Sequence, residues 1–245
     1  MNKREFLKTA LLGTGAACLA PNFSAFARNF AMPHVGEKWT REARFYTATP
    51  KGVRCQICPN ECNIKEGDAG DCHNRMNRGG KLYSIAYGNP CAVHVDPIEK
   101  KPLLHFLPGS HAFSIATAGC NLACLYCQNW TISQTSPDKT DNMDLLPDKV
   151  IEGCKNQKCE SVAYTYSEPI TFYEYTYDTS VLARQEGIKN VLVTAGYINR
   201  EPLLKLCKVI DASNVDLKSF SDDIYLRLNA GKLQPILDTL VTMKK

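Results

Sequence analysis

Residues 118–130 of the 245-residue chain read AGCNLACLYCQNW, which places Cys120, Cys124 and Cys127 in the spacing CxxxCxxC. Thiolates are the usual ligands of iron–sulfur clusters and of zinc, and a closed site of either kind takes four ligands. Three close thiols without an evident fourth ligand indicate a metal site with one open coordination position, which catalysis requires. A zinc site completed by a distant cysteine or histidine is the alternative that spacing alone leaves open.

Strand and helix patterns alternate from about residue 112 onward. Short apolar runs predict buried strands, and apolar residues at helical spacing predict helices. Strands are expected at 113–117, 161–166, 190–194 and 214–218, and helices at 147–158, 170–186, 203–210, 222–228 and 233–243. Strands that alternate with helices in this way pair in parallel through right-handed crossovers, so the predicted fold class is α/β.

Each of the four expected strands ends in polar or metal-binding residues. In a parallel β/α barrel the carboxyl ends of the strands meet at one mouth, where sites are built. The four ends are the cysteine loop (residues 118–130), Ser167-Glu168-Pro169, Ala195-Gly196-Tyr197 and Asp216-Leu217-Lys218. Their side chains are therefore expected to converge on one site.

Several of these residues admit two interpretations. Glu168 would either meet a cation in the site or complement the dipole of the helix that follows it. Asp216 and Lys218 lie two residues apart and should face the same side of a strand, as an internal ion pair or as polar groups offered to a ligand. Cys154 or Cys159 could complete a zinc site, but the apolar helical face around Cys154 favours a core position for it.

Four further cysteines, Cys55, Cys58, Cys62 and Cys72, form a second cluster. They lie in a loop-rich region whose apolar content is too small to hold it folded, so a metal is expected to stabilise it. Four thiolates fit tetrahedral zinc and a [4Fe-4S] cluster equally well, and an auxiliary electron-transfer cluster is the functional alternative. Seven of the twelve cysteines lie in the two clusters, which favours metal binding over disulfides.

The N-terminal part is predicted to contain a leader and a linker. Residues 1–27 resemble an export signal of the twin-arginine type, with Lys3 in place of the first arginine, and an uncleaved amphipathic tail is the alternative. A polar linker is expected at 28–52, the Cys-rich region with short strands at 53–111, and the α/β core at 112–245.

Charge and hydropathy argue against a nucleic-acid ligand and against a transmembrane span. The net charge is +4 with 22% charged residues, and lysine and arginine form no obvious stripe, so nucleic acid is not expected as a ligand. The apolar run of residues 10–20 is too short to span a bilayer, and no later segment reaches the roughly 20 apolar residues that a span needs. No transmembrane span is therefore expected in the mature chain.

The chain resembles radical S-adenosylmethionine (SAM) enzymes, and most of all the pyruvate formate-lyase activating enzyme-like proteins of the AmmeMemoRadiSam system group. The resemblance extends from about residue 53 to residue 245. It rests on the cysteine loop, on Asp96-Pro97-Ile98-Glu99-Lys100-Lys101-Pro102 with His105-Phe106-Leu107-Pro108-Gly109-Ser110, and on Asp216-Leu217-Lys218. The spacing CxxxCxxC with an aromatic residue before the last cysteine is a specific signal.

The resemblance implies that the three loop cysteines hold a [4Fe-4S] cluster whose fourth iron is chelated by the amino and carboxylate groups of SAM. The residues that it implies for SAM are Tyr126 beside the adenine, Glu168 at the amino group, and Asp216 with Lys218 at other polar groups. One electron from the reduced cluster would cleave SAM, and the 5′-deoxyadenosyl radical would abstract hydrogen from a substrate.

The resemblance implies an electron donor, such as flavodoxin or ferredoxin. It also implies a substrate, which is expected to be a partner protein on which a glycyl radical is made, or another component of the AmmeMemoRadiSam system. A non-catalytic iron–sulfur or zinc-binding, electron-transfer module is the alternative. The localisation stays open, because the leader indicates export or membrane association whereas SAM and low-potential electrons are cytoplasmic supplies.

Two features depart from the family pattern. The radical SAM core usually has six strands, so we expect a partial (β/α) barrel, truncated after about four strands, with an N-terminal Cys-rich metal knob. Family members often carry Gly-Gly-Glu where this chain has Tyr166-Ser167-Glu168. The acid is kept, but the flexible glycine pair is replaced.

Overall fold

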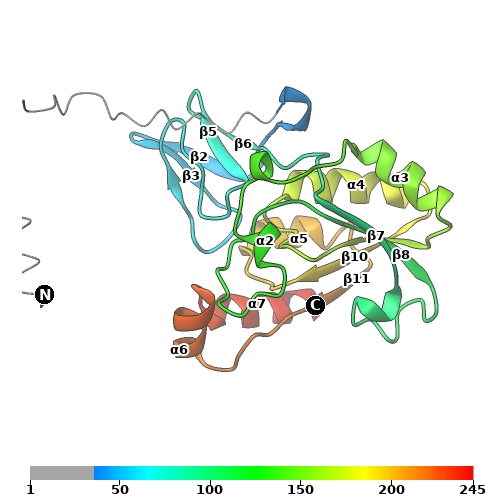
Figure 1. Cartoon of the computed structure of the whole chain (residues 1–245). Coiled ribbons are helices and arrows are strands. Elements are labelled where there is room, and N and C mark those ends of the chain that lie inside the picture. The colour runs from blue at the N-terminus through cyan, green and yellow to red at the C-terminus, as the bar shows by residue number, and fades with distance from the viewer. Residues whose placement is uncertain (1–35, 245) are drawn as a thin grey trace, which may run out of the picture. The chain divides into compact units, whose positions relative to one another are not determined.

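The computed structural model describes residues 36–244, so the predicted leader and the first part of the predicted linker lie outside the described residues (Figure 1). The strands are β1 (Arg41–Glu42), β2 (Tyr46–Thr49), β3 (Gly52–Cys55), β4 (Asn63–Ile64), β5 (Arg75–Arg78), β6 (Lys81–Ser84), β7 (Ala92–Pro97), β8 (His111–Ala116), β9 (Ser161–Tyr164), β10 (Lys189–Thr194) and β11 (Ala212–Val215). The helices are α2 (Trp130–Ser133), α3 (Pro147–Asn156), α4 (Tyr173–Gln185), α5 (Arg200–Leu206), α6 (Asp222–Ile224) and α7 (Leu233–Lys244), with the 3-10 turns η1 (Glu37–Trp39), η2 (Ile98–Lys100) and η3 (Pro137–Lys139) and the π-helical turn η4 (Tyr225–Asn229).

The main sheet has five strands in the order β11-β10-β9-β8-β7. The four strands predicted from the apolar runs are present as β8, β9, β10 and β11, and all of them pair in parallel. The fifth strand, β7, pairs antiparallel with β8 at the edge. We expected residues 92–95 to belong to the Cys-rich region, but the loop between β7 and β8 folds them back onto the main sheet as a hairpin.

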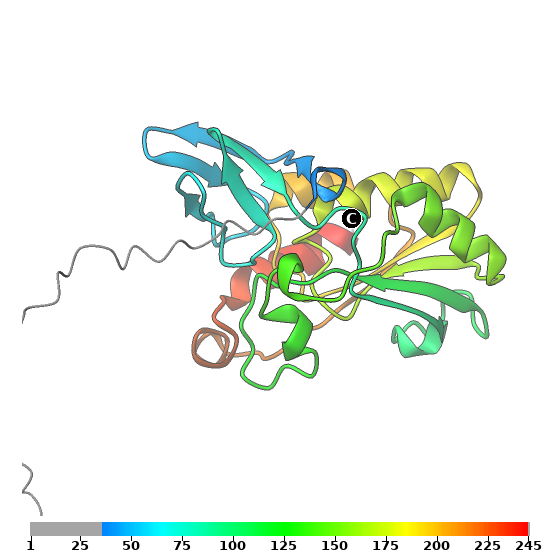
Figure 2. The same ribbon diagram turned by 45° about the horizontal axis from the view of Figure 1, so that its top comes forward.

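Side chains of the main sheet alternate between two faces, as the two-residue period of a strand requires. On one face, Phe113, Val162 and Leu192 belong to the largest apolar cluster, and α3 and α4 pack over this face, which Figure 2 shows from above. On the other face, Ala112 and Ala163 belong to a separate cluster that includes residues of the β7–β8 loop. Small side chains there let the loop approach the sheet closely.

The Cys-rich region forms two small three-stranded sheets, in the orders β1-β6-β5 and β2-β3-β4. Residues 41–49, which we expected within a polar linker, contribute β1 and β2 to these sheets. β1 pairs with a strand far away in sequence, since Arg41 stands opposite Ser84, whereas β2 forms a hairpin with β3 in which Thr49 stands opposite Gly52. The long-range pairing of β1 cannot be read from a pattern of two residues.

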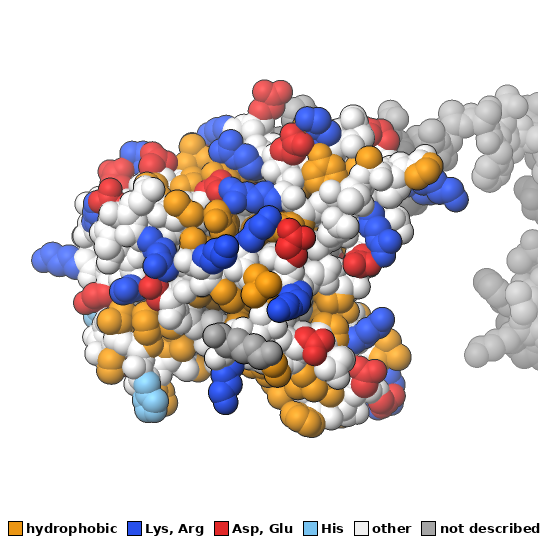
Figure 3. Space-filling model, turned by 180° about the vertical axis from the view of Figure 1, so that it is seen from behind, with side chains coloured by type: hydrophobic (Ala, Val, Ile, Leu, Met, Phe, Trp, Pro, Cys, Tyr) orange, Lys and Arg blue, Asp and Glu red, His pale blue; other side chains and the backbone are white. Residues whose placement is uncertain are grey.

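The surface seen from behind carries mixed charge. In Figure 3 the lysine and arginine side chains lie among acidic and hydrophobic ones and form no continuous basic patch on this face. Several exposed lysines pair with acids, among them Lys155 with Glu186 and Lys205 with Glu201. None of the helices within residues 36–244 is both long enough and apolar enough to cross a bilayer.

A buried ion pair ties the Cys-rich region to the main sheet. Arg75 of β5 donates to both carboxylate oxygens of Glu174 on α4, at 2.9 and 3.1 Å, and both side chains are buried. Glu174 also accepts a hydrogen bond from the backbone N–H of Arg44. Because the carboxylate is satisfied from two sides, the pair fixes how the two parts pack.

We expect Arg75→Met to lower the free energy of unfolding by about 3–5 kcal/mol, because it leaves the carboxylate of Glu174 buried without its cation. Equilibrium urea unfolding measures the effect. Lys149→Met is the matched control, because it breaks the exposed pair of Lys149 with Glu152 and should change stability little. The double variant Arg75→Met/Glu174→Leu should recover much of the loss. Equal stability of Arg75→Met and the control Lys149→Met would contradict the prediction.

Candidate functional site

The cysteine loop and the ends of the parallel strands enclose one cavity of about 460 Å³. The side chains that line it come from the β7–β8 loop, the cysteine loop and α2, and the carboxyl ends of β9, β10 and β11. They are Lys100, Lys101, Pro102, Cys120, Leu122, Cys124, Cys127, Gln128, Asn129, Ser133, Thr165, Tyr166, Ser167, Glu168, Val193, Thr194, Ala195, Asn214, Asp216 and Lys218. The predicted convergence of polar residues at one end of the sheet is observed in the structure.

The cysteine loop is held by close backbone packing. Gly119 has a positive φ of 95°, and a Cβ at this position would lie 2.4 Å from the carbonyl oxygen of Cys72, so only glycine fits. The side chain of Asn74 donates to the carbonyl of Ala118 at 2.5 Å. Asn121 donates in turn to the carbonyl of Tyr197 at 2.7 Å. The loop is thus fastened on both sides of Cys120.

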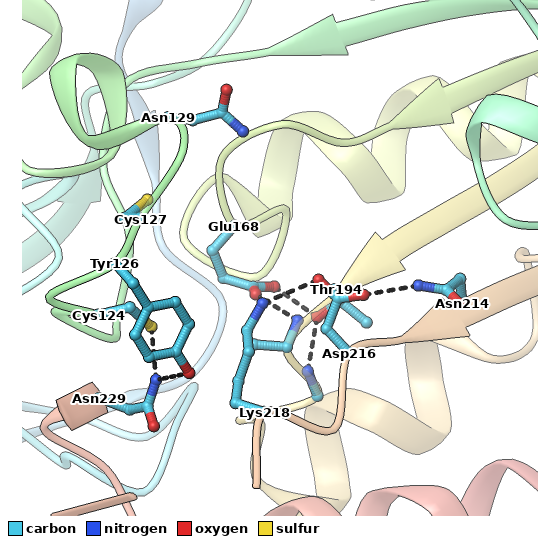
Figure 4. Close-up of polar contacts among 12 residues, drawn as sticks. Cys124, Tyr126, Cys127, Asn129, Glu168, Thr194, Asn214, Asp216, Lys218 and Asn229 are labelled. Carbon is cyan, nitrogen blue, oxygen red and sulfur yellow. Dashed lines mark hydrogen bonds and ion pairs between the residues drawn. The ribbon is translucent and has the colours of Figure 1, made fainter.

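The three loop thiols differ in their surroundings. Cys124 Sγ accepts a hydrogen bond of 3.0 Å from the side-chain amide of Asn229 (Figure 4). Cys127 Sγ lies 3.3 Å from Ser133 Oγ. Burial raises the pKa of the Cys120 thiol, and the nearby charge of Glu168 raises it further. Both effects disfavour the thiolate form of Cys120.

The donor set fits a thiolate-ligated metal group. Three thiols line a single cavity beside a large free volume, and Asn229 directs an N–H group at one of the sulfurs, which favours the thiolate form. Within residues 36–244, no three His, Cys, Asp or Glu side chains are already arranged as a metal site. The sulfurs thus share the cavity without being drawn to a common point.

Glu168 is buried at the end of β9 and reaches the neighbouring strand. Its carboxylate accepts hydrogen bonds from Thr194 Oγ1 at 2.6 Å and from the backbone N–H of Ala195 at 2.8 Å. It also accepts one from the N–H of Ile170, where the following helical segment begins. Burial raises the pKa of Glu168, and these three donors act in the opposite direction. The positive charge of Lys218 acts in the same direction as these donors.

Asp216 and Lys218 lie just after β11 rather than on it, because the strand ends at Val215. Lys218 Nζ donates to Asp216 Oδ2 at 2.9 Å, and Asn214 donates to the other carboxylate oxygen at 2.8 Å (Figure 4). Burial alone lowers the pKa of Lys218, but Asp216 outweighs it and raises the pKa overall. The two residues form an ion pair, as one interpretation of the sequence expects, and both line the cavity.

The opposite wall of the cavity contains a buried charge network. Asp96 accepts hydrogen bonds from Lys100 at 2.8 Å, from Lys101 at 2.6 Å and from the hydroxyl of Tyr166. Burial alone raises the pKa of Asp96, but these donors hold it well below its usual range. The ammonium group of Lys101 also lies over the ring of Tyr166, at 4.5 Å from its centroid.

Tyr166 explains how the chain accommodates its departure from Gly-Gly-Glu. Its φ is 63°, in the left-handed region that favours glycine and costs other residues about 1 kcal/mol. The contacts with Asp96 and Lys101 hold the tyrosine in this conformation, and its carbonyl accepts a hydrogen bond of 2.8 Å from Asn129. Glu168 consequently reaches the cavity without the glycine pair.

Tyr126 and Cys154 lie outside the lining of the cavity. Tyr126 is 54% exposed, and its hydroxyl accepts a hydrogen bond of 2.7 Å from Asn229. Cys154 is buried in the core, as predicted, and its thiol donates to the carbonyl of Cys159, which precedes β9. Both cysteines therefore lie toward the amino end of β9, away from the cysteine loop, and cannot complete its ligand set.

Sequence reasoning missed several residues of the site. Thr194 was expected only as part of a strand, and Asn214 as the start of one, whereas both position carboxylates in the cavity. Asn229 was not considered, because nothing near it resembles a motif and only the fold brings it to Cys124. The position of Thr194 at a strand end was the one available signal.

Sequence comparison identifies the class of protein to which this fold and its thiol-lined cavity belong. The model of the Radical SAM superfamily matches residues 114–245, so the chain belongs to this superfamily. Membership implies a [4Fe-4S] cluster and SAM as cofactors.

Three relatives place the chain within the superfamily. It is 47% identical over 206 residues to an uncharacterized protein of Methanocaldococcus jannaschii, covering 84% of this chain and 61% of that protein. It is 26% identical over 138 residues to a second protein of this organism, named provisionally as a glycyl-radical enzyme activating enzyme, covering 56% and 51%. It is 30% identical over 114 residues to the pyruvate formate-lyase 1-activating enzyme of Escherichia coli, covering 45% and 46%. The chain thus spans about half to three fifths of the length of these relatives.

We expect Cys124→Ala to abolish iron binding at the cysteine loop, because two thiols cannot hold the cluster that the family carries. Iron and acid-labile sulfide per chain, measured after anaerobic reconstitution, provide the test. Cys207→Ala is the control, since Cys207 is exposed and lies outside the cavity. Retention of a full complement of iron by Cys124→Ala would show that the loop is not the ligand set.

Proposed function

We propose that this protein is a radical SAM enzyme in which Cys120, Cys124 and Cys127 bind the cluster and the neighbouring strand ends bind SAM. The observation that carries the proposal is the convergence of the three thiols with Glu168 and Lys218 on one cavity. When bound and reduced, the cluster supplies the electron that cleaves the carbon–sulfur bond of SAM, which yields the 5′-deoxyadenosyl radical that abstracts hydrogen.

The residues at the strand ends have distinct proposed roles. Glu168, held by Thr194 and Ala195, would accept a hydrogen bond from the ammonium group of SAM. Lys218 and Asp216 would bind its polar groups, with Lys218 as donor and Asp216 as acceptor. This division is supported by their positions, because the fixed carboxylate and the ion pair lie on adjacent strand ends beside the cysteine loop.

The wall formed by Lys101, Asp96 and Tyr166 is proposed to face the substrate. Lys101 in the β7–β8 loop and Tyr166 after β9 line the cavity, and Asp96 of β7 accepts hydrogen bonds from both. None of the three is among the proposed SAM residues, so they are available to a second ligand. Asp96 and Lys101 also belong to the stretch of sequence on which the resemblance to the AmmeMemoRadiSam system group rests. A protein substrate that acquires a glycyl radical is the proposed substrate class, with flavodoxin or ferredoxin as the electron donor.

Anaerobic reconstitution tests the proposal directly. The protein should become brown, show a reducible cluster signal by electron paramagnetic resonance, and release 5′-deoxyadenosine when it is reduced in the presence of SAM. Binding of iron without binding or cleavage of SAM would instead identify a non-catalytic iron–sulfur or electron-transfer module.

We expect Glu168→Gln to keep its cluster but to bind SAM about 10- to 150-fold more weakly, because a hydrogen bond to a charged group contributes about 1.5–3 kcal/mol. Iron content and SAM affinity, measured by equilibrium dialysis under anaerobic conditions, separate the two effects. Glu152→Gln on the exposed face of α3 is the control. An unchanged affinity would mean that Glu168 serves only the start of the following helical segment.

A further inference from the structure

The four cysteines of the Cys-rich region surround a second, much smaller cavity. Cys55, Cys58, Cys62 and Cys72 all line a space of about 10 Å³, together with apolar side chains such as Ile57 and Ile64. None of the four forms a disulfide. This site is separate from the cavity of the cysteine loop, and the radical SAM family match, which begins at residue 114, does not include it.

Two loops bring the four thiols together. Cys55 ends β3, and its backbone N–H donates to the carbonyl of Cys62 at 3.0 Å, which closes the loop that contains Cys58. Gly70 donates to the carbonyl of Arg75 at 2.8 Å and closes the turn that contains Cys72. A CxxC pair at the end of a strand and two further cysteines from adjoining turns form the arrangement of a tetrahedral metal site.

Polar side chains border the same cavity. Asn60 and Asn121 line it beside the four thiols. The buried guanidinium group of Arg75 also borders the cavity and would offset part of the negative charge of four thiolates.

The size of the cavity favours a single ion over a cluster. A space of about 10 Å³ holds roughly one water-sized sphere, whereas a cubane cluster has eight atoms. Within residues 36–244 no group is preformed at ligand distances, so an ion would have to draw the four sulfurs together. We propose that Cys55, Cys58, Cys62 and Cys72 bind one tetrahedral divalent ion of the zinc type, and that this ion stabilises the platform beneath the cysteine loop. Binding replaces four thiol protons, which pass to solvent.

The proposed platform consists of contacts between the loop of residues 55–62 and two other segments, the start of α5 and the cysteine loop. The side chain of Asn199, at the start of α5, donates to the carbonyls of Gln56 at 2.9 Å and Cys58 at 3.2 Å. The side chain of Asn60 donates to the carbonyl of Asn121 at 3.1 Å, directly beside Cys120. An ion that fixes the loop of residues 55–62 therefore also fixes the backbone on which the cluster ligands rest.

Metal analysis of the full chain tests the first half of the proposal. The triple variant Cys120→Ala/Cys124→Ala/Cys127→Ala should retain about one zinc per chain and no labile sulfide. Iron with labile sulfide in this variant would identify a second cluster, and a metal-free chain would leave only thiols; either result overturns the proposal. Should the triple variant fail to fold, Co²⁺ titration of the metal-free wild-type chain should show the absorption of a tetrathiolate site.

Single substitutions keep the test specific. Cys62→Ser should lower the zinc content to about a fifth or less, because Cys62 is only half-buried and its replacement removes a ligand without opening the core. Cys62→His should restore zinc, since imidazole is also a zinc ligand. Cys91→Ser, outside both cavities, is the control and should change nothing. Loss of zinc from the control as well, or full retention by Cys62→Ser, would contradict the assignment.

Hydrogen exchange tests the second half. Removal of zinc by a chelator from the cluster-free chain should speed amide exchange in residues 118–130 by about tenfold or more, because the loop loses its support. Exchange in α3, which contacts neither cavity, should stay unchanged. Loss of zinc without faster exchange in residues 118–130 would overturn the proposal that the ion stabilises the cysteine loop. Zinc content and amide exchange are both measured without SAM cleavage.

Discussion

The parallel register between β9 and β10 is the constraint on which the site depends. Tyr164, the last residue of β9, stands opposite Leu192, so the chain beyond β9 runs beside the end of β10. Glu168 can therefore reach the hydroxyl of Thr194 and the N–H of Ala195, which offset the cost of burying a carboxylate. A slip of one residue would turn Thr194 to the other face and leave Glu168 buried without this partner.

A second constraint links the two walls of the cavity through Tyr166. Its left-handed backbone directs the following residues into the cavity, and its hydroxyl contacts Asp96 on the opposite wall. The conformation that a glycine would adopt freely is here stabilised by the Asp96–Lys101 pair. The proposed substrate wall and the proposed SAM residue Glu168 are thus coupled through one residue, so a ligand that moved Lys101 would also disturb Glu168.

Local patterns predicted the elements but not all of their partners. The apolar runs predicted β8, β9 and β10, whose residues are mostly buried. β11 is only partly buried, and its predicted position overlapped the observed strand at Asn214 and Val215. The cysteine spacing and the strand ends located the thiols, Glu168 and Lys218. The contributions of β1 and β7, and the contact of Asn229 with Cys124, depend on pairing between residues far apart in sequence, which short segments do not encode. The same limit applies to Asp216, which the structure places after its strand rather than within it.

As proposed, the two cysteine groups use one ligand chemistry for two purposes. Cys120, Cys124 and Cys127 lie on the loop that follows β8, whereas Cys55 ends β3 and the other three lie on turns beyond it. The loop of residues 118–130 borders a cavity of about 460 Å³ with charged groups on its walls, which leaves room for a ligand beside a cluster. The cysteines at 55–72 enclose about 10 Å³ beside apolar side chains such as Ile57 and Ile64, which leaves no room for a ligand beside a cluster. A catalytic metal site needs an open coordination position, whereas a structural site needs none. The volume and the lining of the two cavities therefore distinguish the two proposed roles, which cysteine spacing alone could not.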